Sequence, residues 1–580
     1  MSEVIGPAAQ QSGGSNIKET IESIVVAFIL AFIFRAFVVE AFVIPTGSMA
    51  PTLDGAHMRF RCPDCGYVFD VNYATANPDD TSVPSEDMPQ DDIYCPNCGY
   101  HITNGPIRDR LGMPQNQYFR DAQGRQFRGP TEFPGGTQPQ PVRYGDRILV
   151  LKYAFLLSPP RRWDVVVFKA PDAPDKYHYT QNYIKRLVGE PGDTLMVLDG
   201  ETYLLDEQNN WQVQRRPRDV QEALWRVVNN NDYYPQGLPR SDRAKPWVQP
   251  WKTSSGENGW NLGHNASDGR VFHFSGTNEQ SIRYDALANP ATQTTNDYLV
   301  YDVPEDQRRI GGENEAGSDS SRNWVSDLKL SALYQRGSGS GSLKMRLSKR
   351  DHEFTAEVSA DSVTLWHHHP DGTTTADGGP VKLADQGIKP DGPLWLEFMN
   401  VNYQVTLRIN GKDVLQTTPA EYSPDVDELL KEFHGLASPP TRDGPEISIA
   451  AADQTCSLAH VSLWRDIYYT NKNTDARLYW AMPDNPVKLH RRGEPRTDGQ
   501  GTYDDDEYFV MGDNSLISGD ARYWTEPIQL PDEDLDVESG RVPGRFMLGK
   551  AFFVYWPAGY RPVAGWPALV PDFGDMRFIH

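Results

Sequence analysis

The chain has 580 residues, of which 38% are hydrophobic and 23% are charged, so it is long enough for several domains and apolar enough to build cores. Its formal net charge of −23 at pH 7 argues against a nucleic-acid partner bound through a broad basic surface. The 48 glycines and 45 prolines favour β-rich or loop-rich domains over a helical bundle. Five cysteines are too few for a disulfide scaffold of this size.

After an N-terminal tail over residues 1–20, one segment is typical of a membrane-embedded helix. Residues 24–44 are apolar except for Arg35 and Glu40, and as a helix they would extend about 31 Å, close to the thickness of a bilayer core. A cleaved secretory signal fits poorly, because the residues before the run are not basic, and a buried core helix is the other alternative. The sequence therefore predicts a single-pass transmembrane helix over residues 21–44, whose orientation the flanking charges do not settle.

Three motifs that could carry chemistry follow in chain order. The first is a Pro/Gly turn at residues 44–53 that holds Ser48, and the second is an apolar strand at residues 183–193 that carries Lys185. A lysine on a buried strand face could lose its proton and act as a general base. The third, residues 508–524, is an apolar strand that leads into a polar loop with Ser518. Each motif alone is an ordinary turn or an exposed lysine, but the ordered set is specific.

Together these motifs resemble the type I signal peptidases, which are membrane-anchored serine proteases with a Ser/Lys dyad. Residues 144–152, 163–168 and 549–553 resemble the family's supporting strands as well. The resemblance implies a mainly β fold, in which an antiparallel β catalytic core of the signal-peptidase type follows the one N-terminal transmembrane helix. That core would comprise residues 45–56, 143–206 and 505–580, with insertions between its parts.

The resemblance also implies roles for individual residues. Ser48 would be the nucleophile and Lys185 the general base, Thr46 would add a hydroxyl to an oxyanion hole made with the N–H of Ser48, and Ser518 would orient the lysine. The family's supporting polar positions correspond to Asp513, Asp520 and Arg522. The family's pockets for small substrate side chains correspond to Met49, Leu53, Tyr183 and Ile184. No cofactor is needed for this chemistry. The chain departs from the family at Trp163, where glycine is common, and at Ala521, which replaces a frequent serine.

The first insertion, residues 57–142, contains two knuckles of the form Cys-Pro-x-Cys-Gly-Tyr. They supply Cys62, Cys65, Cys95 and Cys98, with 29 residues between the pairs. The pattern resembles zinc-ribbon knuckles, and four thiolates around one zinc ion would make a structural site without an open position for catalysis. Two redox pairs or disulfides are the alternative.

The second insertion separates residues 206 and 505. We expect a linker region of unknown role at 207–264, a β-sandwich at 265–470 and a return linker at 471–504. Alternating apolar residues predict strands near 343–347, 354–358 and 405–409, the last followed by the hairpin turn Asn410-Gly411. The pattern resembles laminin-G or concanavalin-like sandwiches, which bind glycans or proteins, although a purely structural appendage is an open alternative. The run His367–His369 is interpreted as a solvated loop.

The resemblance implies a signal peptidase I that cleaves signal peptides from exported preproteins after small residues through an acyl-enzyme. It would be a single-pass protein of the cytoplasmic (inner) membrane, with its catalytic domain on the outer face. Its partners would be preprotein signal peptides and membrane lipid, with a glycan or protein as the ligand of the sandwich and no nucleic acid. One alternative is a catalytically silent membrane-tethered binding protein that acts through its β-sandwich. Another, a self-cleaving Ser/Lys repressor, fits neither the anchor nor the negative charge.

Overall fold

The computed structural model describes most of the chain. The described residues are 18–29, 39–72, 93–102, 118–120, 126–128, 143–171, 181–238, 240–241, 246–254, 259–289, 295–297, 323–436, 444–470, 480–496, 499, 501–516, 518–525, 527–530, 533–559 and 570–580. Strands dominate these residues, which confirms the expectation of a mainly β protein.

The predicted transmembrane helix is only partly helical. Residues 18–29 form a helix and residues 30–38 lie outside the described part, while β1 (Val39–Val43) is a strand paired antiparallel with β8 (Arg147–Leu151). The prediction of a helix up to residue 44 is therefore wrong at its C-terminal end. Glu40, the charge that interrupted the apolar run, lies on β1 and pairs with Lys152 at 3.1 Å. Within the described ranges, no helix is both long and apolar enough to cross a membrane.

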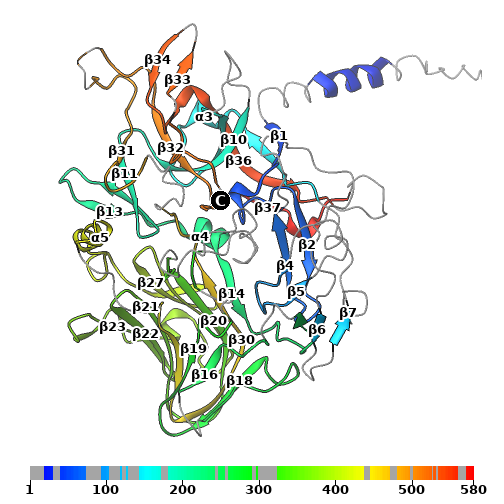
Figure 1. The fold of residues 1–580 in the computed structure, drawn as a ribbon, viewed down its shortest axis with the longest axis vertical. Helices are drawn as coiled ribbons and strands as arrows, with labels where there is room; N and C mark the ends of the chain where they lie inside the picture. Colours follow the sequence, from blue (N-terminus) through cyan, green and yellow to red (C-terminus); the bar gives the residue numbers. More distant parts are fainter. Residues whose placement is uncertain are drawn as a thin grey trace, which may run out of the picture.

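One antiparallel sheet, here called the core sheet, collects strands from three distant parts of the sequence (Figure 1). Its order is β1-β8-β36-β9-β10-β32-β35, and β37 pairs with β36. The strands not yet defined are β9 (Val165–Lys169), β10 (Asn182–Gly189), β32 (Glu507–Met511), β35 (Val542–Pro543), β36 (Met547–Trp556) and β37 (Arg577–Phe578). The sheet therefore joins segments that lie on both sides of each insertion in the sequence.

A smaller sheet packs beside the core sheet, and apolar side chains of both share one core cluster. Its order is β13-β12-β11-β31, formed by β11 (Thr194–Leu198), β12 (Glu201–Leu205), β13 (Trp211–Val213) and β31 (Val487–Lys488). β31 lies in the predicted return linker, so that segment contributes to the fold. Short elements nearby are η1 (Gly47–Met49), α3 (Ala154–Leu157), β33 (Ile528–Leu530), β34 (Glu533–Val537), η6 (Gly544–Phe546) and η7 (Phe573–Asp575).

The first insertion forms two small hairpins that carry the cysteine knuckles at their turns. They are β2 (His57–Arg61) with β3 (Val68–Asn72), and β4 (Ile93–Tyr94) with β5 (His101–Ile102). A separate small sheet joins this insertion to the second one through β6 (Tyr118–Arg120), β7 (Gln126–Arg128) and β15 (Arg240–Ser241).

The second insertion is a sandwich of two antiparallel sheets around one large apolar cluster. The first sheet contains β14 (Arg226–Asn230), β17 (Trp260–Asn261), β18 (Val271–Gly276), β20 (Leu328–Arg336), β26 (Leu394–Val401), β27 (Gln404–Ile409), β28 (Lys412–Gln416) and β30 (Gln454–Arg465). The second contains β16 (Trp251–Thr253), β19 (Gln280–Tyr284), β21 (Leu343–Lys349), β22 (His352–Val358), β23 (Ser362–His368), β24 (Thr374–Ala376), β25 (Val381–Lys382) and β29 (Ile447–Ala451). Its remaining short elements are α4 (Arg218–Leu224), η5 (Ala384–Gln386) and α5 (Val426–Phe433).

Several sequence expectations for the sandwich can be compared with these strands. The alternating apolar runs lie on β21, β22 and β27, and the turn residues Asn410 and Gly411 have positive φ of 50° and 80°. The predicted start at residue 265 is too late, because β14, β16 and β17 belong to the sandwich sheets. The interpretation of His367–His369 as a solvated loop is also wrong for His367, which is buried at the end of β23.

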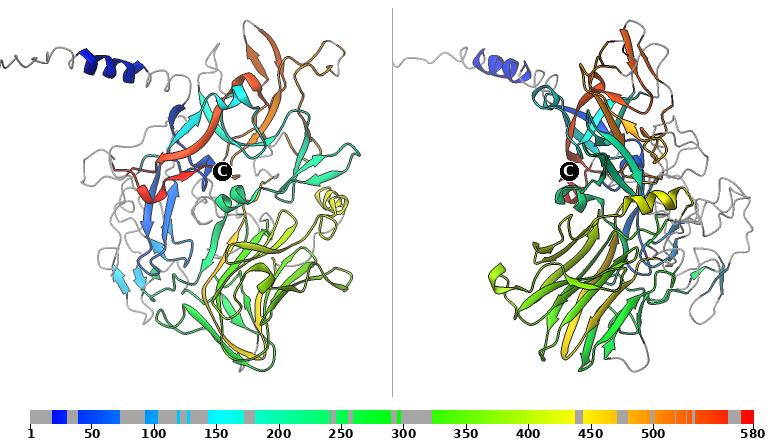
Figure 2. Two further views of the ribbon diagram at one scale, coloured as in Figure 1. Left: turned by 180° about the vertical axis from the view of Figure 1, so that it is seen from behind. Right: turned by 90° about the vertical axis from the view of Figure 1, so that its left-hand side faces the viewer.

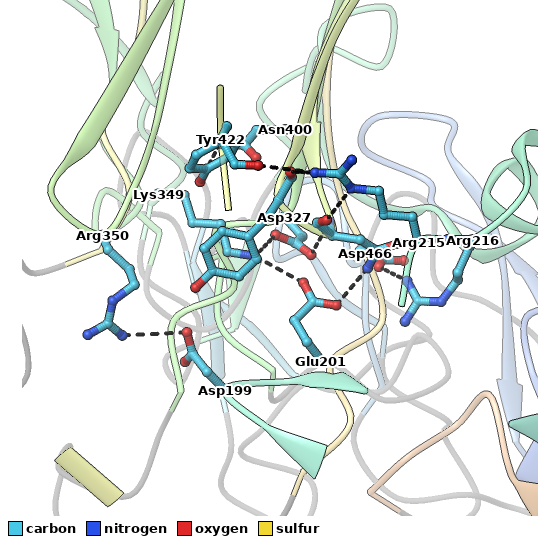
Figure 3. A network of polar contacts seen from close by, with 12 residues as sticks. Asp199, Glu201, Arg215, Arg216, Asp327, Lys349, Arg350, Asn400, Tyr422 and Asp466 are labelled. Atoms are coloured by element: carbon cyan, nitrogen blue, oxygen red, sulfur yellow. Dashed lines mark hydrogen bonds and ion pairs between the residues drawn. The ribbon is translucent and has the colours of Figure 1, made fainter. Parts of the chain in front are cut away.

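The sandwich is attached to the rest of the protein through a buried charged junction (Figure 3). Lys349, at the end of β21, pairs with Glu201 of β12 at 2.9 Å and also with Asp327. Asn402 donates from its side chain to Glu201 and from its backbone to Asp327. Burial alone would raise the pKa of Glu201, but the charges of Lys349 and Arg216 and the hydrogen bonds to Glu201 together lower the pKa to about 2. In Figures 1 and 2 α4 lies between the sandwich and the core sheet.

Candidate active site

Ser48 lies on η1, the single turn of 3-10 helix that follows β1. Gly47 and Met49 on either side of it are buried, whereas Ser48 itself is half-buried and therefore reachable. The turn is held from the C-terminal part of the chain by Asn514, whose side chain donates to Gly47 O at 3.0 Å and whose backbone donates to Ser48 O at 3.1 Å. Asn514, which is more than 460 positions away in sequence, thus holds the backbone of Ser48 in place.

Lys185 comes from β10, and its side chain points at this turn. Its Nζ atom lies 2.7 Å from Ser48 Oγ, within hydrogen-bond distance. The residue is 5% exposed, and its Nζ is 5.9 Å from the centroid of the Tyr183 ring. The structure therefore brings together the two residues that the sequence analysis placed in the dyad, across 137 positions of sequence.

Arg186, the neighbour of Lys185, forms a buried ion pair with Asp513. Its guanidinium donates to both carboxylate oxygens of Asp513, at 2.7 and 2.8 Å, and Thr52 donates to the same carboxylate at 2.5 Å. Burial alone would lower the pKa of Arg186, but the Asp513 carboxylate raises it above its usual value. This cluster ties the lysine strand, the loop after Ser48 and the residue before Asn514 into one unit. The sequence analysis missed Arg186 and Thr52, although both stand inside its motifs.

The loop after β32 is organised by Asp520 and Arg522. Arg522 donates to both oxygens of Asp520 at 2.9 Å, and Asp520 also accepts from Gly512 N at 2.9 Å. The remaining donors of Arg522 bind Thr470 O and the hydroxyl and carbonyl oxygens of Ser515. Burial alone would lower the pKa of Arg522, but the Asp520 carboxylate raises it. The hydrogen bonds of Asp520 and Arg522 therefore hold the backbone of this loop in one conformation.

Ser518 is buried beside the backbone of Ser48, and it faces Gly512 at a distance that leaves no room for a Cβ on that glycine. A Cβ on Gly512 would lie 2.1 Å from Ser518 Oγ and 2.6 Å from Ser48 O. Among the described residues Ser518 Oγ has no hydrogen-bond partner, so the expected role of this serine in orienting Lys185 stays a prediction.

The residues predicted to line the substrate pocket separate into two groups. Met49 and Leu53 are fully buried in an apolar cluster against which the half-buried Ile184 packs. Tyr183 lies on the opposite side of its strand and packs with Phe168 and Trp524. Thr46, predicted for the oxyanion hole, is exposed at the start of η1.

Trp163 stands at a position where the resemblance leads us to expect glycine, and its surroundings show how a large residue is accommodated there. Its φ is 75°, a conformation in which glycine is favoured. The residue is nevertheless buried, its ring lies 5.6 Å from the guanidinium of Arg216, and its carbonyl accepts a hydrogen bond from Arg186 at 2.8 Å. Packing therefore holds a tryptophan where the backbone alone would prefer glycine.

The four knuckle cysteines converge on one point. All are buried, and their sulfur atoms lie within 4.8 Å of one another. The pairs Cys62–Cys98 and Cys65–Cys95 have Sγ atoms 3.6 Å apart, much farther than in a disulfide. Tetrahedral zinc with Zn–S bonds of about 2.3 Å requires about 3.8 Å between sulfurs, so the donor set and its spacing fit zinc.

Both knuckles also hold the start of the second insertion. Asp64 accepts from Gln236 N and Leu238 N, at 2.9 and 3.0 Å. Asn97 accepts from Asn230 N at 2.7 Å and donates to Tyr233 O at 3.0 Å. The cluster is thus placed to fix the segment that follows β14.

Comparisons with known proteins show which sequences this chain is similar to. The family model described as signal peptidase, peptidase S26, matches residues 17–62, 127–336 and 445–556, which is more than half of the chain. Signal peptidase I of Pseudomonas aeruginosa is 37% identical over 87 residues, 14% of this chain and 26% of that protein. Probable signal peptidase I-2 of Synechocystis sp. is 32% identical over 78 residues, 13% of this chain and 36% of that protein. The chain spans about a quarter to a third of the length of these curated relatives.

Likeness to solved structures adds nothing to this. A β-glucanase of Bacillus licheniformis covers 37% of this chain and 92% of its own at 7% identity, with a TM-score of 0.21. The Crh5 transglycosylase in complex with NAG covers 37% and 79% at 11% identity, also with a TM-score of 0.21. Scores this low carry no argument about the chain.

Proposed function

The chain belongs to the signal peptidase family, peptidase S26, and from this premise we propose that it is a signal peptidase I with a Ser/Lys dyad. It would remove N-terminal signal peptides from exported preproteins by cutting after small residues. The observation that carries the proposal is the 2.7 Å distance between Lys185 Nζ and the half-buried Ser48 Oγ. A serine hydroxyl is a weak nucleophile until a neighbouring base accepts its proton.

The dyad would work in two stages. Neutral Lys185 takes the proton of Ser48 Oγ while the oxygen attacks the scissile carbonyl carbon, and the resulting ammonium then protonates the departing amine. This leaves the signal peptide esterified to Ser48. In the second stage Lys185 takes a proton from water, the water oxygen attacks the ester, and Ser48 regains its proton as the peptide carboxylate leaves. The low exposure of Lys185 favours the neutral form, because desolvation disfavours the charged amine.

The neighbouring residues would stabilise and orient the reacting groups. The N–H of Ser48, at the first turn of η1, and the exposed hydroxyl of Thr46 are candidates for the oxyanion hole, whose donors gain strength as charge develops. Ser518 would hold Lys185. Met49, Leu53 and Ile184 on one side of β10, and Tyr183 on the other side, would form two apolar surfaces that accept small side chains of the substrate.

The cysteine cluster would hold a structural zinc ion. Cys62, Cys65, Cys95 and Cys98 supply four soft sulfur ligands, which leave no position open for catalysis. The hydrogen bonds from the knuckles to residues 230–238 support a role in fixing the insertion against the core. The peptidase chemistry itself would require no cofactor.

The N-terminal segment would anchor the protein in the cytoplasmic (inner) membrane as a single pass, with the core on the outer face. Support comes from the exposed apolar side chains of the helix over residues 18–29, which include Ile21, Ile24, Val25, Val26, Phe28 and Ile29 at 48–60% exposure. Apolar side chains that crowd one exposed helix favour burial in lipid. Signal peptides of preproteins and membrane lipid would be the partners.

Cleavage of a model preprotein by the detergent-solubilised full chain tests the proposal. The parent should cut at the signal junction, whereas Ser48→Ala and Lys185→Ala should not, provided that both variants unfold at the parent's temperature. If the parent is folded and inert, the proposed activity is wrong. The alternative of a silent membrane-tethered protein that acts through its sandwich, by binding a glycan or protein, would then apply.

A further inference from the structure

Three histidines gather at one end of the sandwich, far in sequence from both the dyad and the cysteine cluster. His352 begins β22, His367 lies near the end of β23, and His369 follows it by two residues. The register pairs Phe354 with His367, so residue 352 lies across from residue 369. Because strand residues two apart share a face, all three imidazoles lie on the same side of the sheet. His368 points to the other side.

The three rings come close enough to share one ion. One ring nitrogen of each histidine lies within 4.8 Å of the corresponding nitrogens of the other two. His352 Nδ1 is 2.8 Å from His367 Nε2, and the rings of His367 and His369 have centroids 3.7 Å apart. A tetrahedral metal with nitrogen bonds of about 2.0–2.1 Å needs its ligand atoms about 3.3 Å apart, so only small side-chain shifts separate this arrangement from a coordinated one.

Outer partners hold two of the rings in the required orientation. Asp377 Oδ2 lies 2.7 Å from His367 Nδ1, which leaves His367 Nε2 facing the other histidines. The hydroxyl of Thr375 donates to Asp377 Oδ1 at 2.7 Å and lies 2.8 Å from His369 Nε2. A carboxylate on the far nitrogen of an imidazole is the usual support of a metal-binding histidine, because it fixes the ring and raises its basicity.

The burial of the cluster suits an ion that enters from solvent. His367 is 1% exposed, whereas His352 and His369 are half-buried at the rim. The ring of Tyr422 lies 5.4 Å from that of His352 and closes the inner side together with Phe354. An ion could therefore reach the rim histidines and seat against the buried one.

We propose that His352, His367 and His369 bind a divalent transition-metal cation of the kind that Zn²⁺ represents. Three neutral imidazoles suit zinc, copper or nickel and do not suit magnesium or calcium, which prefer oxygen. Three protein ligands leave a fourth position for water or for an oxygen donor from outside the protein. The site is independent of the cysteine cluster and of the dyad.

Metal content of the purified full chain, measured after dialysis against zinc and then against a weak chelator, tests the proposal. The double variant His352→Asn/His369→Asn removes the rim ligands and leaves the buried ring in place. His368→Asn is the matched control, because it changes the same histidine run on the opposite face. We expect the double variant to hold one zinc fewer per chain than the parent and the control to match the parent. Cys62→Ser/Cys65→Ser should lower the content separately.

Cobalt substitution gives a second readout. Cobalt at the histidine site should absorb visible light without the thiolate charge-transfer band that a cysteine site produces. This histidine-site absorption should be lost in the double variant and kept in the parent and in His368→Asn. Equal metal content in the parent and the double variant would overturn the proposal, and the cluster would then be a hydrogen-bonded aromatic packing of His352 and His367. A loss in His368→Asn as large as in the double variant would also overturn it, because it would indicate nonspecific binding to the run.

Discussion

Replacement of Gly512 by alanine should disable the active site through a single added methyl group. The new Cβ would meet Ser518 Oγ at 2.1 Å and Ser48 O at 2.6 Å, whereas Cβ atoms in proteins essentially never approach closer than 3.0 Å. The neighbours must therefore move by about 0.9 Å, and a displacement near 1 Å in a catalytic group costs about 10²-fold in rate. We expect kcat/KM to fall by about 10², with a loss of about 1–3 kcal/mol in the free energy of unfolding from overpacking.

Gly519→Ala is the matched control for this prediction. Gly519 lies in the same loop, yet a Cβ there would meet no heavy atom within 4 Å, so its kcat/KM should stay within about threefold of the parent. The assay is cleavage of a model preprotein at several substrate concentrations, with thermal unfolding of both variants. The reasoning is refuted if Gly512→Ala cleaves as fast as Gly519→Ala.

Three further predictions concern stability. Lys349→Met leaves Glu201 and Asp327 buried without their cation and should lower the free energy of unfolding by about 3–5 kcal/mol in chemical denaturation; a loss below about 1 kcal/mol would contradict this. Burial raises the pKa of Glu507 from 4.5 to about 7, so its stabilising contribution is full below pH 4.5 and is lost as pH rises through 7. Glu507→Gln should remove this decline in the free energy of unfolding, which is roughly 3 kcal/mol. The measurement is the free energy of unfolding from pH 4.5 to 8, and the same dependence on pH in the variant and the parent would count against the prediction. Trp163→Gly relieves the strain of a positive φ, which stabilises the fold by about 1 kcal/mol, but it also removes a buried ring, which costs about 3–5 kcal/mol. The variant should therefore melt at a lower temperature than the parent. A higher melting temperature would show that backbone strain outweighs the packing of the ring.

The sequence could predict the strands of the core sheet and the proximity of Lys185 to Ser48, because these residues stand in short ordered motifs. Ser48 and Lys185 each lie beside the turn or strand that positions them, so local pattern and resemblance were sufficient. The sandwich strands were predictable for the same reason, since apolar alternation is a local signal.

Long-range contacts account for what the sequence did not predict. The apolar run at residues 39–43 suits a helix or a strand equally, and only its pairing with β8 decides between them. The Arg186–Asp513 pair joins residues 327 positions apart. His352 approaches His367 only because β22 and β23 form a hairpin with that register. None of these contacts leaves a periodic trace in the sequence.

The base role of Lys185 is the central claim, and Lys185→Arg tests it most directly. Arginine keeps a cationic side chain of similar length beside Ser48 but cannot give up its proton near neutral pH. The account predicts that this variant folds with the parent's melting temperature and loses at least about 10³-fold in kcat/KM on a model preprotein, since both proton transfers are blocked. Cleavage within tenfold of the parent would show that a positive charge is sufficient, and it would contradict the dyad mechanism.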